Sequence, residues 1–191
     1  MRCNICTPRL AARMFETAMT EHERQEILAS LEQGSTALLD SLHGVTEELA
    51  VRIPAPGRWT ILQCAEHVAV AEEHLFSMIT SSKQTESPLI NERREAFILT
   101  FGADRSTRRE SPEDAKPTGR FSTLSVAVQY FLAGRERTIQ FVNTHKDDLR
   151  SRITSHPLMG VVNCHEILLL MAVHPARHAK QIEEIKAATT S

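Results

Sequence analysis

The sequence predicts an all-α protein, a four-helix bundle with an inserted segment between its second and third helices. Apolar residues recur at helical spacing over four long segments, at about 21–44, 61–81, 122–144 and 164–187. Polar linkers separate these segments, and no stretch shows the period-two alternation that is typical of strands. Long amphipathic helices joined by polar linkers are the pattern of a helical bundle.

Capping motifs mark the starts of three of these helices. "TEHE" at Thr20 and "TILQ" at Thr60 have the form in which a threonine caps the helix and a Glu or Gln three residues later binds back to it. Asn163 and Glu166 stand in the same relation before the last helix. We therefore expect helices to begin near residues 21, 61 and 164.

The segment 82–120 differs from the rest of the chain. It is rich in charge and contains two Ser-Pro pairs and the string "KPTGR", which indicate helix starts and loops. We interpret it as an insertion that carries one short helix at about 88–100. Residues 19–188 then form the bundle. Residues 1–18 are interpreted as a disordered leader with incidental cysteines, because the CxxC of Cys3 and Cys6 has no further metal ligands nearby.

Composition excludes several classes of function. The net charge of −2 and the lack of a long Lys/Arg block argue against nucleic-acid binding. The longest apolar stretch, "ILLLMAV", is far too short to span a membrane, and the N-terminus has no signal-like apolar region. Four cysteines are too few for a disulfide framework in a chain of 191 residues. We therefore expect a cytoplasmic protein that binds neither membrane nor nucleic acid.

Two histidines interrupt the apolar stripe of the last helix. The residues of this stripe are Ile167, Met171, His174, His178, Ile182 and Ile185. Buried imidazoles need partners, and an i, i+4 pair brings two ring nitrogens within reach of one divalent ion. The HxxxH spacing is weak evidence by itself. His67, on the inward side of the second helix, is the expected third ligand, which would leave a fourth position open as in catalytic zinc sites.

Other residues near this pair have competing interpretations. Pro175 lies between the two histidines and removes a backbone hydrogen bond, which fits a functional distortion or a tolerated kink. Gln181 is expected to support a ligand ring or to be a solvated amide. His74 is a candidate supporting residue, for which a solvated position is favoured. Surface or helix-end positions are expected for His22, His43, His145 and His156.

No catalytic base emerges from the sequence. Glu66 and Glu73 lie on the second helix near the expected metal, but carboxylates on a helix flank are usually solvated. Cys64 and Cys164 are interpreted as core residues, because apolar surroundings raise the pKa of a thiol and make it inert. The catalytic residues therefore stay unassigned.

Two strings carry a family resemblance. "GRWTILQCAEHVAVAEEHLF" resembles the start of the second helix in the DinB/YfiT-like superfamily, and "HPARHAKQIEEI" resembles its closing His-x-x-x-His-x-x-Gln-Ile helix. "HPLMG" resembles the family's connecting loop, and the likeness covers about 20–187. Pro175 departs from the residue expected after a ligand, and the 82–120 segment is longer and less regular than expected.

The resemblance implies a four-helix bundle that holds a divalent metal through His67, His174 and His178. Nickel or zinc is the expected metal, with iron or manganese as alternatives. The family includes transferases that use low-molecular-weight thiols such as bacillithiol or mycothiol. The predicted function is thus a thiol S-transferase or hydrolase acting on a small molecule. The alternatives are a non-enzymatic metal- or ligand-binding bundle of the stress-response type and a metal-free bundle. A homodimer through a helical face is also expected, and the 82–120 segment is expected to cover the metal site.

Overall fold

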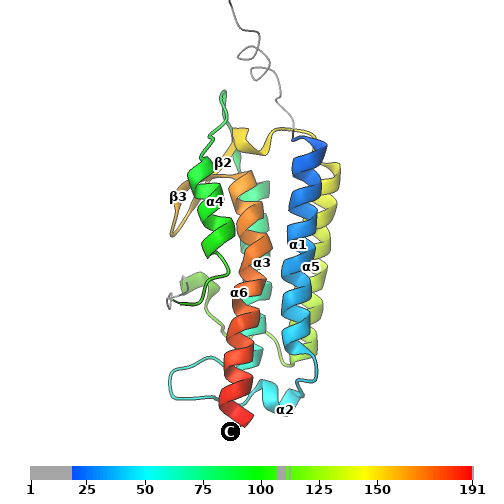
Figure 1. Ribbon diagram of the computed structural model, residues 1–191, viewed down its shortest axis with the longest axis vertical. Helices are drawn as coiled ribbons and strands as arrows, with labels where there is room; N and C mark the ends of the chain where they lie inside the picture. The colour runs from blue at the N-terminus through cyan, green and yellow to red at the C-terminus, as the bar shows by residue number, and fades with distance from the viewer. Residues whose placement is uncertain (1–18, 107–110, 112, 191) are drawn as a thin grey trace, which may run out of the picture.

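A computed structural model describes residues 19–106, 111 and 113–190 (Figure 1). The predicted leader, with Cys3 and Cys6, lies outside the described residues. Four long helices form a bundle, as predicted: α1 (Glu21–Leu42), α3 (Ile61–Thr80), α5 (Leu124–Thr144) and α6 (Cys164–Thr190). Helix α1 packs against α5 and α6, and α3 packs against the same two helices.

Helices α3 and α5 run in the same direction along the bundle (Figure 1). Parallel neighbours in a bundle require a long crossover connection, and the segment between these two helices supplies it. It contains β1 (Lys83–Gln84), α4 (Glu92–Phe101) and the 3-10 turn η2 (Glu113–Ala115). The predicted short helix at 88–100 is therefore shifted, because Asn91 caps it through the Arg94 N–H at 3.0 Å and it begins at Glu92.

The three predicted capping pairs are all present. Thr20 with Glu23 and Thr60 with Gln63 form complete capping boxes at the starts of α1 and α3. At the start of α6, the Glu166 N–H donates to Asn163 Oδ1 at 2.8 Å, and the Asn163 N–H donates to Glu166 Oε2 at 3.0 Å. Two further short elements, α2 (Glu47–Ala50) and η3 (Leu149–Ser151), lie in the connections.

A small antiparallel sheet was not predicted. Its order is β1, β2 (Arg152–His156), β3 (Gly160–Asn163), with Ile153 opposite Asn163 and His156 opposite Gly160. The string "SHPLMG", interpreted as a loop, forms the hairpin between β2 and β3, and Gly160 adopts a φ of 68° at its end. These strands are too short to show a period-two pattern, so the sequence interpretation as purely helical was incomplete.

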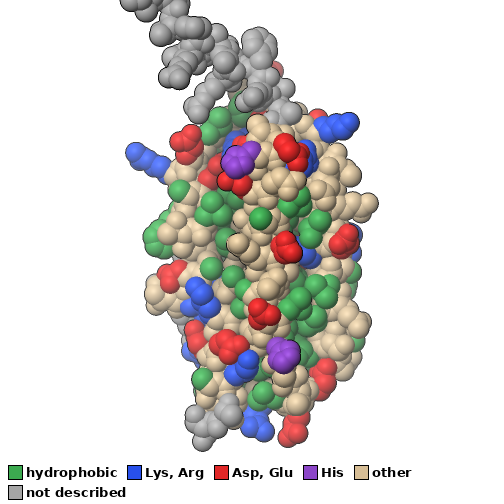
Figure 2. Space-filling model, turned by 45° about the vertical axis from the view of Figure 1, so that its right-hand side comes forward, with side chains coloured by type: hydrophobic (Ala, Val, Ile, Leu, Met, Phe, Trp, Pro, Cys, Tyr) green, Lys and Arg blue, Asp and Glu red, His purple; other side chains and the backbone are tan. Residues whose placement is uncertain are grey.

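Two apolar clusters fill the interior of the bundle. On α6, the first cluster ends at Ala172 and the second includes Ile182 and Ile185. The turns of α6 between them carry His174, Pro175 and His178. Among the described residues, no helix is long and apolar enough to cross a membrane. Acidic and basic side chains are interspersed over the face drawn in Figure 2.

Candidate metal centre

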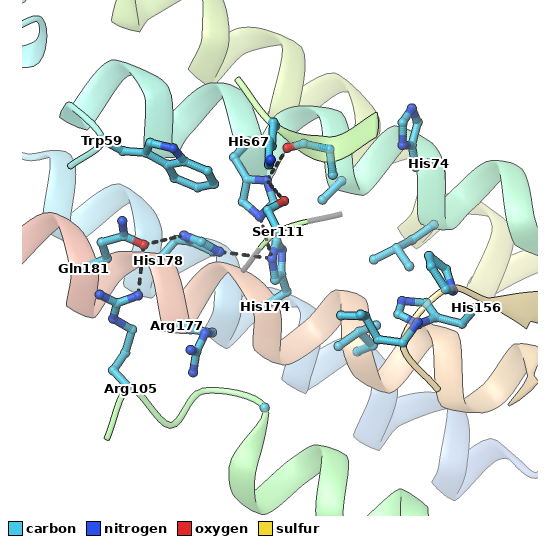
Figure 3. Close-up of a pocket in the computed structure, with 18 of the residues that line it drawn as sticks. Trp59, His67, His74, Arg105, Ser111, His156, His174, Arg177, His178 and Gln181 are labelled. Carbon is cyan, nitrogen blue, oxygen red and sulfur yellow. Dashed lines mark hydrogen bonds between the residues drawn. The ribbon is translucent and has the colours of Figure 1, made fainter. Parts of the chain in front are cut away.

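The structure brings together the three histidines that the sequence analysis selected. His67 projects from the second turn of α3, and His174 and His178 project from α6 (Figure 3). His174 Nε2 lies 3.2 Å from His67 Nε2 and 3.1 Å from His178 Nε2. One donor atom from each ring lies within 4.8 Å of the others. Among the described residues, no fourth His, Cys, Asp or Glu joins this group.

The hydrogen bonds of Nδ1 indicate which ring nitrogen carries the proton in His67 and in His178. His67 Nδ1 lies 2.6 Å from the carbonyl oxygen of Ala115, which can only accept. His178 Nδ1 lies 3.1 Å from Gln181 Oε1, and Arg105 Nη1 donates to the same oxygen at 3.0 Å. Because an arginine can only donate, its contact identifies the amide oxygen as the atom that faces His178. Both Nδ1 atoms are therefore donors, and in the neutral rings both Nε2 atoms carry bare lone pairs.

Burial keeps these rings neutral. His67 and His178 are 6% and 5% exposed. Burial lowers the pKa of His67, although the hydrogen bond to Ala115 acts in the opposite direction. Burial, and then the neighbouring imidazoles that would repel a second positive charge, hold the pKa values of His174 and His178 well below their usual range. Near neutral pH the group therefore presents uncharged imidazoles, the form that binds metals.

The spacing fits a tetrahedral ion. Zinc–nitrogen bonds of about 2.0–2.1 Å at tetrahedral angles place ligand nitrogens about 3.3 Å apart. The observed separations of 3.1 and 3.2 Å are close to this value. Without a cation, three converging Nε2 atoms that share at most one proton would repel one another. The donor set therefore fits a divalent metal, and the described residues would supply three of its four tetrahedral ligands.

A cavity of about 600 Å³ adjoins the histidines, which is the usual size of a small-molecule site. The Trp59 ring lies beside the three-histidine group, with its centroid 5.1 Å from that of His67 and 6.4 Å from that of His178. Arg105 and Gln181 line one end of the cavity, and His74 and His156 line the other (Figure 3).

The 82–120 segment contributes to the wall of this cavity, through Arg105, Ser111 and Ala115 among others. Its position depends on Glu66, which is buried and accepts the backbone N–H groups of Thr118, Gly119 and Arg120 at 2.7, 3.2 and 3.0 Å. Glu66 therefore anchors the loop that presents the Ala115 carbonyl to His67. The interpretation of Glu66 as a solvated flank residue was wrong.

Two further histidines are partly buried. His74 and His156 both line the cavity, although solvated and loop positions had been favoured for them (Figure 3). His74 lies two turns after His67, so helical spacing offered a signal for its direction. His156 offered none, because its place at the end of β2 depends on the unpredicted hairpin. Glu73 instead binds Arg120 at 2.6 Å and Tyr130 at 2.8 Å, away from the cavity.

Both described cysteines are core residues, as interpreted from the sequence. Cys64 and Cys164 are fully buried. Burial raises the pKa of the Cys64 thiol to about 12 and also raises that of Cys164. Neither thiol is therefore available as a nucleophile near neutral pH.

Comparisons with known proteins agree with this architecture. The structure of YfiT from Bacillus subtilis, described as a probable metal-dependent hydrolase with an unusual four-helix bundle topology, aligns with a TM-score of 0.57. The two chains are 16% identical, and the alignment covers 90% of each. TT2238, described as a four-helix bundle protein, aligns at 0.41 with 21% identity, over 88% of this chain and 99% of that chain. No curated protein matches the sequence.

A sequence model of the DinB superfamily matches residues 30–182, which is most of the chain and includes all three clustered histidines. The fold of YfiT and the match of the family model agree with the four-helix bundle described above. The chain therefore belongs to the DinB superfamily.

Proposed function

We propose that His67, His174 and His178 bind one divalent metal ion and that the protein is a metal-dependent enzyme acting on a small molecule. The observation that carries this proposal is the convergence of three buried Nε2 atoms, two of which have their Nδ1 protons committed to oxygen acceptors. Buried histidines that only fill space have no reason to aim three Nε2 atoms, at least two of them acceptors, at one point.

The metal is nickel or zinc in this proposal, with iron and manganese as alternatives, because neutral imidazole suits several first-row ions. Ala115 and Gln181 would orient two of the three rings through their outer nitrogens, as supporting groups do in known metal sites. When bound, such an ion lowers the pKa of a coordinated water or thiol toward neutrality. That chemistry serves either hydrolysis or thiol transfer.

Several described residues bear on the choice of reaction. The description of YfiT as a probable metal-dependent hydrolase favours hydrolysis. Of the cysteines that the structure describes, Cys64 and Cys164 are buried and inert, so thiol transfer is proposed with a low-molecular-weight thiol as the second substrate. Glu184 is a poor general base, because the Arg105 guanidinium beside it holds the pKa of this carboxyl below its usual range. Water and thiol are thus the two nucleophiles to compare.

The first test is the metal content of protein purified without an affinity tag, measured by elemental mass spectrometry. We expect close to one equivalent of a divalent metal, and its loss in His67→Ala and His174→Ala. His74→Ala is the matched control, since it removes an imidazole from the same cavity and should retain the metal. Metal-free protein that cannot be loaded, with variants that change only stability, would contradict the proposal.

Loading should also stabilise the fold. At a free metal concentration about 100 times the dissociation constant, binding adds about 2.7 kcal/mol to the free energy of unfolding. Activity of the loaded protein is then compared on nitrophenyl esters and on electrophiles mixed with low-molecular-weight thiols. Binding of metal without turnover of either class would favour the non-enzymatic, metal-binding alternative.

A further inference from the structure

Pro175 interrupts the hydrogen bonding of α6 between two of the proposed ligands. Proline has no backbone N–H, so the carbonyl of Met171, four residues earlier, lacks its usual helical donor. Met171 and Pro175 are both buried, so bulk water does not reach this carbonyl. A buried carbonyl without a donor is costly, and a donor from another element is therefore needed.

Arg135 of α5 supplies that donor. Its Nη2 lies 2.8 Å from the carbonyl oxygen of Met171, and its Nη1 lies 3.0 Å from the carbonyl oxygen of Leu31 in α1. Arg135 is 2% exposed and reaches both backbones from the middle of the bundle. One planar side chain therefore joins three helices at the level of the proline.

The buried charge of Arg135 is balanced by Glu72 of α3. Arg135 Nη2 donates to Glu72 Oε2 at 2.9 Å, and the Thr138 hydroxyl donates to Glu72 Oε1 at 2.9 Å. Glu72 lies on the same helix as His67, five residues further along. The pair thus connects the helix of His67 to the segment of α6 that carries His174 and His178.

Close packing of α1 completes the arrangement. Gly34 of α1 faces the carbonyl of Ala172, and a Cβ on Gly34 would overlap that oxygen. The same Cβ would lie 3.7 Å from Cδ of Pro175. Any side chain at position 34 would push α1 away from the interrupted part of α6, and would lengthen the contact between Arg135 and the Leu31 carbonyl.

We propose that Arg135 takes the place of the backbone N–H that Pro175 lacks, and thereby positions His174 and His178 relative to His67. Arg135 is a positioning residue that does not touch the metal. The proposal rests on the metal site proposed above, but the contact between Arg135 and Met171 has a consequence of its own for the metal-free protein. If residue 175 had a backbone N–H, that group would bind the Met171 carbonyl, and the loss of Arg135 would disturb α6 less.

The test is a double-mutant comparison in two backgrounds, the wild-type chain and Pro175→Ala. Glu72→Met with Arg135→Met removes the buried pair without leaving a single charge behind. In the wild-type background we expect zinc affinity to fall about tenfold, the size of effect known for supporting groups at metal sites. We also expect faster amide exchange over residues 173–181 of the metal-free protein. In the Pro175→Ala background both effects should shrink markedly.

Arg94→Met is the matched control. It removes a guanidinium that binds a carboxylate of α6, Glu166, at 2.6 Å, more than two helical turns before the proline. Its effects should be the same in both backgrounds. Equal effects of the Glu72/Arg135 replacement in both backgrounds would overturn the proposal, because they would show a general packing role with no link to the missing N–H.

A milder variant covers the case in which the paired replacement does not fold. Arg135→Lys keeps the charge opposite Glu72 but loses the forked donor. It should lower the unfolding midpoint and zinc affinity more in the wild-type background than in the Pro175→Ala background. Failure of both variants to fold in both backgrounds would also overturn the proposal. If wild-type protein binds no zinc, the metal site fails, while the amide exchange of the metal-free variants still decides the role of Arg135.

Discussion

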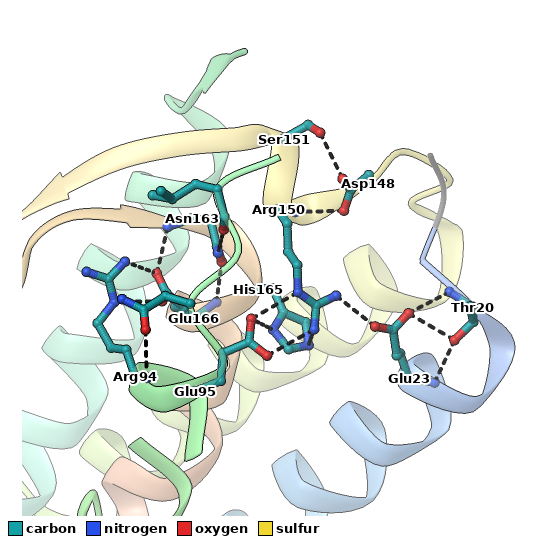
Figure 4. Close-up of polar contacts among 12 residues, drawn as sticks. Thr20, Glu23, Arg94, Glu95, Asp148, Arg150, Ser151, Asn163, His165 and Glu166 are labelled. Atoms are coloured by element: carbon teal, nitrogen blue, oxygen red, sulfur yellow. Dashed lines mark hydrogen bonds and ion pairs between the residues drawn. The ribbon is translucent and has the colours of Figure 1, made fainter. Parts of the chain in front are cut away.

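Two buried polar clusters on α6 contain histidines, and they are organised in opposite ways. In the first turn, His165 Nε2 lies 3.3 Å from Arg150 Nη2, and its Nδ1 lies 3.4 Å from Glu95 Oε1 (Figure 4). Arg150 in turn binds Glu95 at 2.9 and 3.0 Å and Glu23 at 2.7 Å. Each nitrogen of His165 therefore faces a group of complementary character.

The three-histidine group has no such balance among the described residues. Its three rings direct Nε2 atoms toward one another, and no carboxylate joins them. A buried histidine is therefore not by itself a sign of function, since both ring nitrogens of His165 lie beside charged groups of the protein. The informative observation is a cluster of histidines whose Nε2 atoms face one another with no carboxylate beside them among the described residues.

The largest expected effect is on metal affinity, which should depend on the three-histidine group and not on the cluster around His165. His174→Leu should raise the zinc dissociation constant about 100-fold, or about 2.7 kcal/mol, because one of three ligands is lost. His165→Leu should leave it within about twofold, since distant sites act independently. Competition with a chelating dye measures both constants. Similar losses in the two variants would remove the distinction between the clusters.

The second effect is on the free energy of unfolding, which should depend on the ion pairs of Arg150 in the cluster around His165. Arg150→Met should lower the free energy of unfolding in urea by about 2 kcal/mol, because Glu95 and Glu23 both lose a charged partner. Arg93→Met, which replaces an exposed residue of α4, is the control and should change it by less than about 0.5 kcal/mol. Zinc affinity should be unchanged in both. A fall in zinc affinity with Arg150→Met would link the clusters.

The third effect is the pH dependence that Glu95 gives to the first-turn cluster. Burial alone would raise the pKa of Glu95, but His165 and Arg150 beside it lower the value to about 2. Because the folded pKa is depressed, this stabilisation is fully present above the unfolded value near 4.5 and is lost as the pH falls toward 2. Glu95→Gln should therefore reduce the slope of the free energy of unfolding plotted against pH between about 4.5 and 2. An unchanged slope would contradict the assignment.

The smallest expected effect concerns the support of one ligand ring. Gln181→Ala removes the acceptor of His178 Nδ1 and should weaken zinc binding about tenfold. Lys180→Ala, at an exposed neighbouring position on α6, should have no effect. Isothermal titration with zinc compares the two variants with wild type. Equal affinities in all three proteins would show that the ring of His178 is held by packing alone.

Much of the fold was predictable because its signals are local. The capping pair at Thr20 and Glu23 requires residues three apart, and the apolar stripes require residues three and four apart. The sheet escaped prediction because its three strands are short and because β1 pairs with β2, which follows α5 in the chain. The buried Glu72 and Glu66 also escaped, since a carboxylate on a helix is usually solvated and its partner here lies 63 or 52 residues away.

The sequence by itself determined the four helices, the common face of His174 and His178, and the choice of His67 as their expected companion. Helical periodicity suffices for these, because it depends only on neighbours along the chain. Only the tertiary structure showed that Ala115 and Gln181 bind the Nδ1 atoms of His67 and His178. The contact between Arg135 and the Met171 carbonyl was likewise visible only there. Those contacts join segments far apart in the chain or need side-chain geometry, and no local spacing encodes either.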